Sequence, residues 1–424
     1  MKLFNFVIFL FIIFFVVYSH EETSLHCTGK LSLFQVIECV LDHSPEYKYE
    51  KQELSAIAGR RIANAYLFPS NPILFFSQSI RTEPNNSKSY LNGEILVSQE
   101  IYLSAQRRAK IQTSEIEKAA QTAKIELIRR NTIADTIKAS IQYENSKLVL
   151  NETKELYKIS SELYTFIQER VKKGLLAPID LDLAEAEKIK MFKILQISKR
   201  NYSIAKSNLT VMMGIPFESN LEILDIPETI HVKKFNLEAL LKNALHSRPE
   251  ILLAEKNMQF QEKKTEVLKL QRIPNLTISG FVQKDGFNEN VIGARASFPL
   301  TIWKTNRGEI LENQAQVQKS YSLLEIQTHT IKQEVIQALS NFQSLEEEIQ
   351  TYKQQSLERT HDSILALQKA IKMGQMNLKD ALIIQQSLVN FKLSYLDTKR
   401  DWLVSGVELL RVSGYPILEI DIEK

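Results

Sequence analysis

Two long stretches of the chain lack both glycine and proline, the residues that most often end helices. Neither residue occurs between Gly93 and Gly174, nor between Gly308 and Gly374. The second stretch has 65 residues, which in a single α-helix would measure about 95–100 Å at about 1.5 Å per residue. Its apolar residues recur mostly every three or four positions among Glu, Lys and Gln, which predicts a coiled-coil-like helix with one apolar face. A globular domain rarely contains such a helix, so the pattern predicts a long rod or tube.

The composition agrees with a folded, mainly helical chain. Its 424 residues include only 12 glycines and 11 prolines, well below their usual shares, which excludes collagen-like and turn-dense all-β architectures. The chain has 53 basic and 50 acidic residues, so its net charge is only +3. A nucleic-acid-binding protein usually has a larger or more clustered positive charge, and we expect no nucleic-acid partner.

The first residues predict export from the cytoplasm. After Lys2, residues 3–18 are almost wholly apolar, and residues 1–19 fit a secretory signal peptide with cleavage near Ser19. An uncleaved anchor and a lipid attached to Cys27 are the alternatives. Export leads to an oxidising compartment, where Cys27 and Cys39 are a possible disulfide, unless both stay unpaired.

The chain contains an internal duplication. Landmarks recur in the same order at offsets of about 200 residues, which predicts one repeat over residues 31–231 and another over 234–418. The recurring pairs are Pro45-Glu46 with Pro249-Glu250, Pro69 with Pro274, Arg108 with Arg307, Gly174 with Gly374, and Gly214 with Gly414.

Each repeat contains a predicted helical hairpin. Long helices are expected at about 104–172 and 306–372, with tips at 173–180 and 373–380. Gly174 and Gly374 would supply the left-handed residue that ends each long helix. Pro178 fits the first position of the next helix, and Asn377 with Asp380 predicts a capping box.

Each repeat also contains a predicted strand pair, at about 72–101 and 275–300. Apolar and polar residues alternate there, although Phe281 interrupts the polar series. Strands with one apolar and one polar face suit a transmembrane β-barrel, and a soluble hairpin packed on a helix is the alternative. Four strands cannot close a barrel, so a barrel would need strands from several chains.

No segment predicts a catalytic or cofactor site. The sequence has no phosphate-binding glycine loop, no HExxH and no GxSxG, and its seven histidines are scattered. We expect neither enzymatic activity nor a metal site nor a cofactor.

Several of these segments resemble the TolC-like outer-membrane efflux proteins. The tip segments 170–181 and 372–381 are similar to the periplasmic tip motifs of that family, and residues 208–216 are similar to its repeat-ending motif. Residues 298–308 are similar to its strand-to-helix junction, particularly that of the heavy-metal (CzcC-like) branch. The resemblance covers about residues 31–418.

The resemblance implies a mainly α fold with a small β part, in which two strand pairs per chain are pooled in a homotrimer. Three chains would form a 12-stranded β-barrel in outer-membrane lipid and an α-helical tunnel across the periplasm. Such a channel passively conducts metal cations, drugs or proteins that an inner-membrane pump and a periplasmic adaptor (membrane fusion) protein deliver, as in RND efflux or type I secretion.

The resemblance also implies roles for the tips. Arg170, Gly174, Leu175, Gly374 and Gln375 would form the adaptor-docking surface. Asp180 and Asp380 would narrow the periplasmic entrance, although a carboxylate in the first turn of a helix is also favoured by the helix dipole alone.

Two positions depart from the best-known drug-exporting members of the family. Met376 stands where they carry an entrance-locking arginine, and Ile383 stands where they carry a second acidic residue. A gate closed by that ion pair is therefore not expected, and Lys173, Lys372 or Lys379 would have to replace the arginine. A periplasmic coiled-coil scaffold or adaptor without a barrel is the alternative function.

Overall fold

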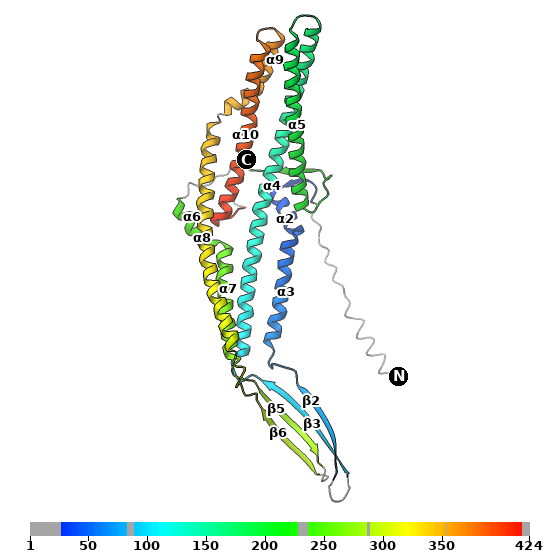
Figure 1. The fold of residues 1–424 in the computed structure, drawn as a ribbon, viewed down its shortest axis with the longest axis vertical. Helices are drawn as coiled ribbons and strands as arrows, with labels where there is room; N and C mark the ends of the chain where they lie inside the picture. Colours follow the sequence, from blue (N-terminus) through cyan, green and yellow to red (C-terminus); the bar gives the residue numbers. More distant parts are fainter. Residues whose placement is uncertain (1–26, 83–88, 228–235, 286–288, 353, 418–424) are drawn as a thin grey trace, which may run out of the picture.

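The computed structural model describes residues 27–82, 89–227, 236–285, 289–352 and 354–417. The predicted signal peptide lies outside these residues. The molecule is elongated, with a four-stranded sheet at one end and two helical hairpin tips at the other (Figure 1). The expected mainly helical fold with a small β part is confirmed.

One order of elements occurs twice along the chain: two short helices, two strands, a long helical stretch and a returning helix. The first pass comprises α2 (Leu33–His43), α3 (Pro45–Ala65), β2 (Ile73–Thr82), β3 (Ser89–Ile101), α4 (Gln106–Lys172) and α5 (Pro178–Met212). The second comprises α6 (Leu237–Ser247), α7 (Pro249–Leu270), β5 (Leu276–Lys284), β6 (Asn290–Ser297), α8 (Arg307–Thr351), α9 (Gln354–Lys372) and α10 (Leu378–Ser413).

The long helical stretch differs between the two passes. Helix α4 runs unbroken for 67 residues, but the prediction of one helix over 306–372 is wrong, because α8 ends at Thr351 and Tyr352 has an extended ψ of 105°. The Tyr352 ring packs against Phe391 and Tyr395 of α10, with centroids 5.4 and 5.5 Å apart. This aromatic contact favours the break between α8 and α9. The break contains neither glycine nor proline, so the absence of those residues did not predict an unbroken helix correctly.

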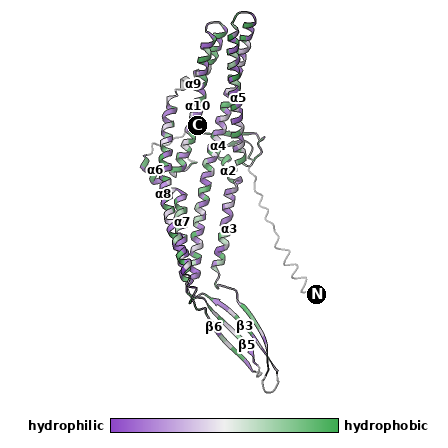
Figure 2. Ribbon diagram, in the orientation of Figure 1, coloured by the Kyte–Doolittle hydropathy of each residue, from purple (hydrophilic) through white to green (hydrophobic). Residues whose placement is uncertain are grey.

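The helices stand side by side in a layer. In the half nearer the sheet, neighbouring helices follow the order α3, α4, α7, α8, and in the half nearer the tips the order is α5, α4, α10, α9 (Figure 1). Clusters of buried apolar residues lie between neighbouring helices, and apolar and polar residues alternate along the helices (Figure 2). The two edges of the layer therefore belong to different repeats.

A small parallel strand pair, β1 (Gly29–Ser32) with β4 (Leu221–Leu224), lies midway between the sheet and the tips (Figure 1). We call this middle part of the molecule the waist. Cys27, just before β1, forms a disulfide with Cys39 of α2, with an S–S distance of 2.06 Å. Both cysteines are buried, at 6% and 0% exposure, in a core to which α2, α4, α5 and both strands contribute. A sulfur in a disulfide cannot carry a lipid thioether, so the structure contradicts a lipid on Cys27. The sequence did not reveal β1 or β4, because four residues carry too little alternation.

The double substitution Cys27→Ser/Cys39→Ser is expected to reduce the free energy of unfolding by about 2–4 kcal/mol, because it frees the chain before β1 from α2 in the unfolded state. Guanidinium denaturation measures the effect. Dithiothreitol present during unfolding should lower the wild-type midpoint to that of the variant and leave the variant's own midpoint unchanged. Equal midpoints of wild type and variant without reductant would show that the bond contributes nothing.

Candidate functional site

The first helical tip ends in a tight glycine turn. Gly174 has a φ of +73°, its N–H donates to the Val171 carbonyl at 2.9 Å, and the Leu175 N–H donates to the Arg170 carbonyl at 2.9 Å. This pair of bonds is a Schellman motif, which satisfies the last carbonyls of α4. Glycine suits the position because an L side chain is strained at that φ.

The second tip repeats this geometry. Gly374 has a φ of +72°, its N–H donates to the Ile371 carbonyl at 3.0 Å, and the Gln375 N–H donates to the Ala370 carbonyl at 2.9 Å. The five residues expected to form a docking surface therefore lie on two matching turns. Arg170 lies over the Phe166 ring at 5.2 Å, and Leu175 is 57% exposed.

The two tips pack against each other through a shared apolar core. Residues of the first hairpin meet residues of the second in one buried cluster, formed by Leu163, Ile167, Ala184, Ile371, Leu378 and Ala381. Both turns are thus held at the same end of the molecule (Figure 1).

The acidic residues Asp180 and Asp380 occupy the first turns of α5 and α10. The Asp180 carboxylate accepts a hydrogen bond from the Ala177 N–H at 3.2 Å. The predicted capping box at Asn377 is wrong, because the Asn377 side chain accepts from the Lys379 N–H at 3.0 Å and the exposed Asp380 carboxylate makes no bond back within the described residues. Each carboxylate is near a helix N-terminus, where the dipole favours negative charge.

The sheet has the order β2-β3-β5-β6, and all its neighbouring strands are antiparallel. The register places most apolar residues of the four strands on one face, since side chains alternate between faces. This apolar face comprises Leu74, Phe76, Ile80, Leu91, Ile95, Val97, Leu276, Ile278, Val282, Ile292, Ala294 and Ala296.

The opposite face is mostly polar. Arg295 forms an ion pair with Glu94 at 3.3 Å and lies over the Phe281 ring at 5.1 Å. The structure also explains why Phe281 interrupts the polar series. Its ring covers Gly293, where an added Cβ would come within 2.5 Å of it. A glycine on the neighbouring strand thus makes room for the aromatic side chain.

Both edges of the sheet are open in the described part of the chain. β2 pairs with β3 alone and β6 with β5 alone. Exposed strand edges of this length invite pairing with another chain.

Two searches of the described residues gave negative results. None of the described helices has a segment long and apolar enough to cross a membrane. Within the same residues, no three His, Cys, Asp or Glu side chains are grouped in a way that suits a metal ion.

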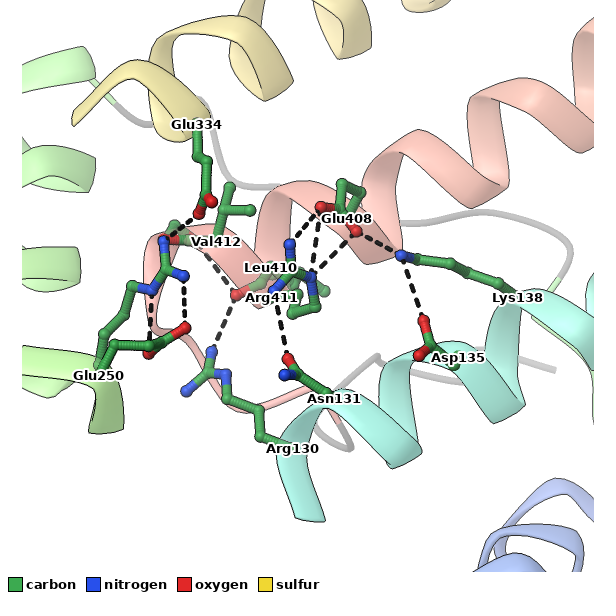
Figure 3. Close-up of polar contacts among 12 residues, drawn as sticks. Arg130, Asn131, Asp135, Lys138, Glu250, Glu334, Glu408, Leu410, Arg411 and Val412 are labelled. Atoms are coloured by element: carbon green, nitrogen blue, oxygen red, sulfur yellow. Dashed lines mark hydrogen bonds and ion pairs between the residues drawn. The ribbon is translucent and has the colours of Figure 1, made fainter. Parts of the chain in front are cut away.

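A network of partly buried charges joins the repeats at the waist (Figure 3). Arg248, at the start of α7, is 4% exposed and pairs with Glu250 at 2.5 Å and with Glu334 of α8 at 2.6 Å. Arg130 of α4 donates to the carbonyls of Leu410 and Tyr415, at 3.0 and 2.8 Å. These arginines tie the C-terminal end of α10 to helices of both repeats.

Glu408 of α10 is the acidic centre of the network (Figure 3). It accepts from Arg411 at 2.6 Å and pairs with Lys138 of α4. Burial alone would raise the pKa of Glu408, but the hydrogen bonds from Arg411 and Lys138 outweigh it and hold that pKa at about 2. Sequence analysis missed this network. Pro249-Glu250 stood out as a repeat landmark, but Arg248, the partner of Glu250, makes its other contacts 86 and 164 positions away, at Glu334 and Val412.

Comparisons with known proteins agree with this architecture. The family model described as outer membrane efflux protein matches residues 240–415. No curated protein matches the sequence. Among solved structures, the outer-membrane channel OprN has a TM-score of 0.74 at 15% identity, covering 91% of this chain and 90% of its own. The Campylobacter jejuni CmeC outer membrane channel has a TM-score of 0.71 at 18% identity, covering 90% and 85%. At such identities the likeness shows the fold.

Glu408→Gln is expected to lower the free energy of unfolding at pH 7 by about 1–2 kcal/mol, since it removes a charged acceptor that remains about one-third exposed. The folded pKa lies below the unfolded value, so the stabilisation is present above about pH 4.5 and is lost as the pH falls toward 2. Denaturant midpoints between pH 7 and pH 2 measure both effects, with Glu155→Gln on the exposed side of α4 as the control. A variant whose midpoint falls with acid as steeply as the wild type would contradict this role.

Proposed function

The chain is a member of the TolC-like outer membrane efflux protein family, and on this premise we propose that it is the outer-membrane channel of a tripartite efflux system. Members of the family are channel proteins rather than enzymes. The chain conducts solutes passively from the periplasm to the outside, after a pump in the inner membrane and a periplasmic adaptor deliver them. Residues 1–19 act as the export signal, and residues 31–231 and 234–418 are the duplicated units.

The open edges support this proposal most strongly. In the sheet the edge strands are β2 and β6, each with one open side. Near the sheet the edge helices are α3 and α8, and near the tips they are α5 and α9. First-repeat elements always form one edge and second-repeat elements the other. Contact between unlike edges is heterologous, and it forms a ring when the rotation from one copy to the next closes. Three copies would close a barrel of 12 strands, an even number in the range of such barrels.

The two faces of the sheet agree with a closed membrane-spanning barrel. The apolar face suits lipid, and the polar face, with Glu94 and Arg295, suits a water-filled lumen. The helix layer continues from the sheet as the wall of a tunnel. Its length follows from α4, whose 67 residues correspond to about 100 Å at about 1.5 Å per residue.

The helical tips form the periplasmic end of the channel. Arg170, Gly174, Leu175, Gly374 and Gln375 form the surface that docks the adaptor, which their position on two exposed matching turns supports. Asp180 and Asp380 narrow the entrance. Three copies of each carboxylate near an axis attract cations and repel anions, as charged rings do in other channels.

The purified protein is expected to be a trimer by mass and to give discrete conductance steps in a planar bilayer. Asp380→Asn should reduce the cation preference, seen as a reversal potential closer to zero in a salt gradient, while Glu155→Gln, about five turns from the tip, should not. An unchanged reversal potential would show that Asp380 does not line the constriction. A protein that stays in the aqueous phase without detergent and never conducts would favour the scaffold alternative.

Gly174→Ala with Gly374→Ala is expected to abolish export while leaving conducting trimers in the membrane. Nothing lies within 4 Å of a Cβ at either position, so the effect comes from backbone strain, about 1–2 kcal/mol per turn, which reshapes the tip. Gly59→Ala is the matched control, since Gly59 also has open space around it and is an ordinary helical residue. Normal export by the double variant would show that these turns are not part of the docking surface.

A further inference from the structure

A row of apolar side chains crosses the polar face of the sheet at one level. The register pairs Phe75 of β2 with Leu96 of β3, and it pairs Leu96 with Phe281 of β5. Directly paired residues of antiparallel strands point to the same face, with their side chains in contact distance. On β6 the row ends at Gly293, which leaves room for the Phe281 ring. We call Phe75, Leu96 and Phe281 the apolar row.

Contacts within the sheet cover only the middle of the apolar row. Leu96 is 9% exposed, because a phenylalanine stands on either side of it. Phe75 is 50% exposed, and Ile73, which precedes it on the same face, is 62% exposed. Pairing of β2 with a strand of another copy would cover the flank of Phe75 but not the side that points away from the sheet. An exposed apolar surface of this kind marks an interaction site.

Polar side chains border the apolar row on both sides. Three of the four residues at each of the two adjacent register positions are polar. They are Ser77, Glu94 and Gln283 away from the helices, and Ser98, Ser279 and Arg295 toward them. Arg295 lies over the Phe281 ring at 5.1 Å and pairs with Glu94 at 3.3 Å. This ion pair reaches across the row, and its two charges cancel.

We propose that the apolar row binds uncharged organic solutes that carry an aromatic ring. This inference rests on the proposed channel function, under which the polar face lines the lumen and three copies place the row there three times. Phenyl rings favour offset or edge-to-face contact with other aromatic rings, and the contact also buries apolar surface. The cancelled charges of Arg295 and Glu94 complement a solute without net charge, because a charged one would find no surplus of the opposite sign.

Current through single trimers in a planar bilayer tests the binding with two uncharged, water-soluble probes. Para-nitrophenyl maltoside carries an aromatic ring, and maltose is the same sugar without it. We expect the nitrophenyl probe to reduce the wild-type current along a saturating curve, since a bound molecule occupies part of the lumen. Maltose should give no saturation. Phe75→Ser should raise the half-saturating concentration of the nitrophenyl probe at least about fivefold, because it removes the more exposed ring.

Phe76→Ser is the matched control. It makes the same change one residue along the strand, on the apolar face, and should leave the half-saturating concentration unchanged. Phe75→Leu keeps an apolar side chain and removes only the ring, so it should weaken binding even if Phe75→Ser does not assemble. Equal half-saturating concentrations for wild type, Phe75→Leu and Phe75→Ser would overturn the proposal.

The same recordings separate this inference from the channel function. Discrete conductance steps that do not respond to the nitrophenyl probe in a saturating way would contradict the binding site alone. Protein that gives no conductance steps would contradict both proposals.

Discussion

A helix in a layer that is one helix thick can bury only its flanks, and the architecture of this chain depends on that constraint. Each internal helix has a neighbour on both sides, but the edge helices have a main neighbour on one side alone, α4 for α3 and α5, α10 for α9, and for α8 first α7 and then α10 along its length. The sheet has the same problem at β2 and β6, whose outer N–H and C=O groups have no partner strand in one chain. In the proposed channel the chain is one sector of a closed wall, and the elongated shape, the two-faced sheet and the paired tips fit an assembly in which several sectors join.

At the waist, the two repeats hold their first helices in place by different interactions. In the first, a disulfide between Cys27 and Cys39 fixes the chain before β1 to α2 inside an apolar core. In the second, Arg248 takes the place that Ser44 has in the first repeat, and it bonds two carboxylates and approaches the end of α10. A covalent link is independent of pH and salt, whereas a buried ion pair is stable only while each charge keeps its partner. Reducing agents therefore loosen the waist of the first repeat, whereas changes of pH that neutralise a charge loosen that of the second.

The features that the sequence could reveal are local ones with a strong pattern. Turns at Gly174 and Gly374 need a left-handed residue, and strands with two faces need alternation, so both can be predicted from neighbouring residues. The break at Tyr352 depends on aromatic contacts with α10, and the network around Glu408 depends on residues of α4 far away in the chain. Neither has a local signal, because helix propensity there is unremarkable and carboxylates on long helices usually face water. The capping box at Asn377 failed for a related reason: the Asn side chain bonded a nearer N–H, and the local motif permitted both arrangements.

The distribution of charge on the polar face of the sheet bears on where a channel of this kind would select its solutes. Within the described strands this face carries Arg81 and Arg295 against Glu94 and Glu100, so its formal charges cancel. Arg295 and Glu94 also pair directly, which reduces the field that either would project into a lumen. Three copies of a neutral face remain neutral and cannot discriminate by the sign of charge. In the proposed channel, selection by the sign of charge then falls to other parts of the wall, among them the tips, where Asp180 and Asp380 are the acidic residues in the first turns of the returning helices.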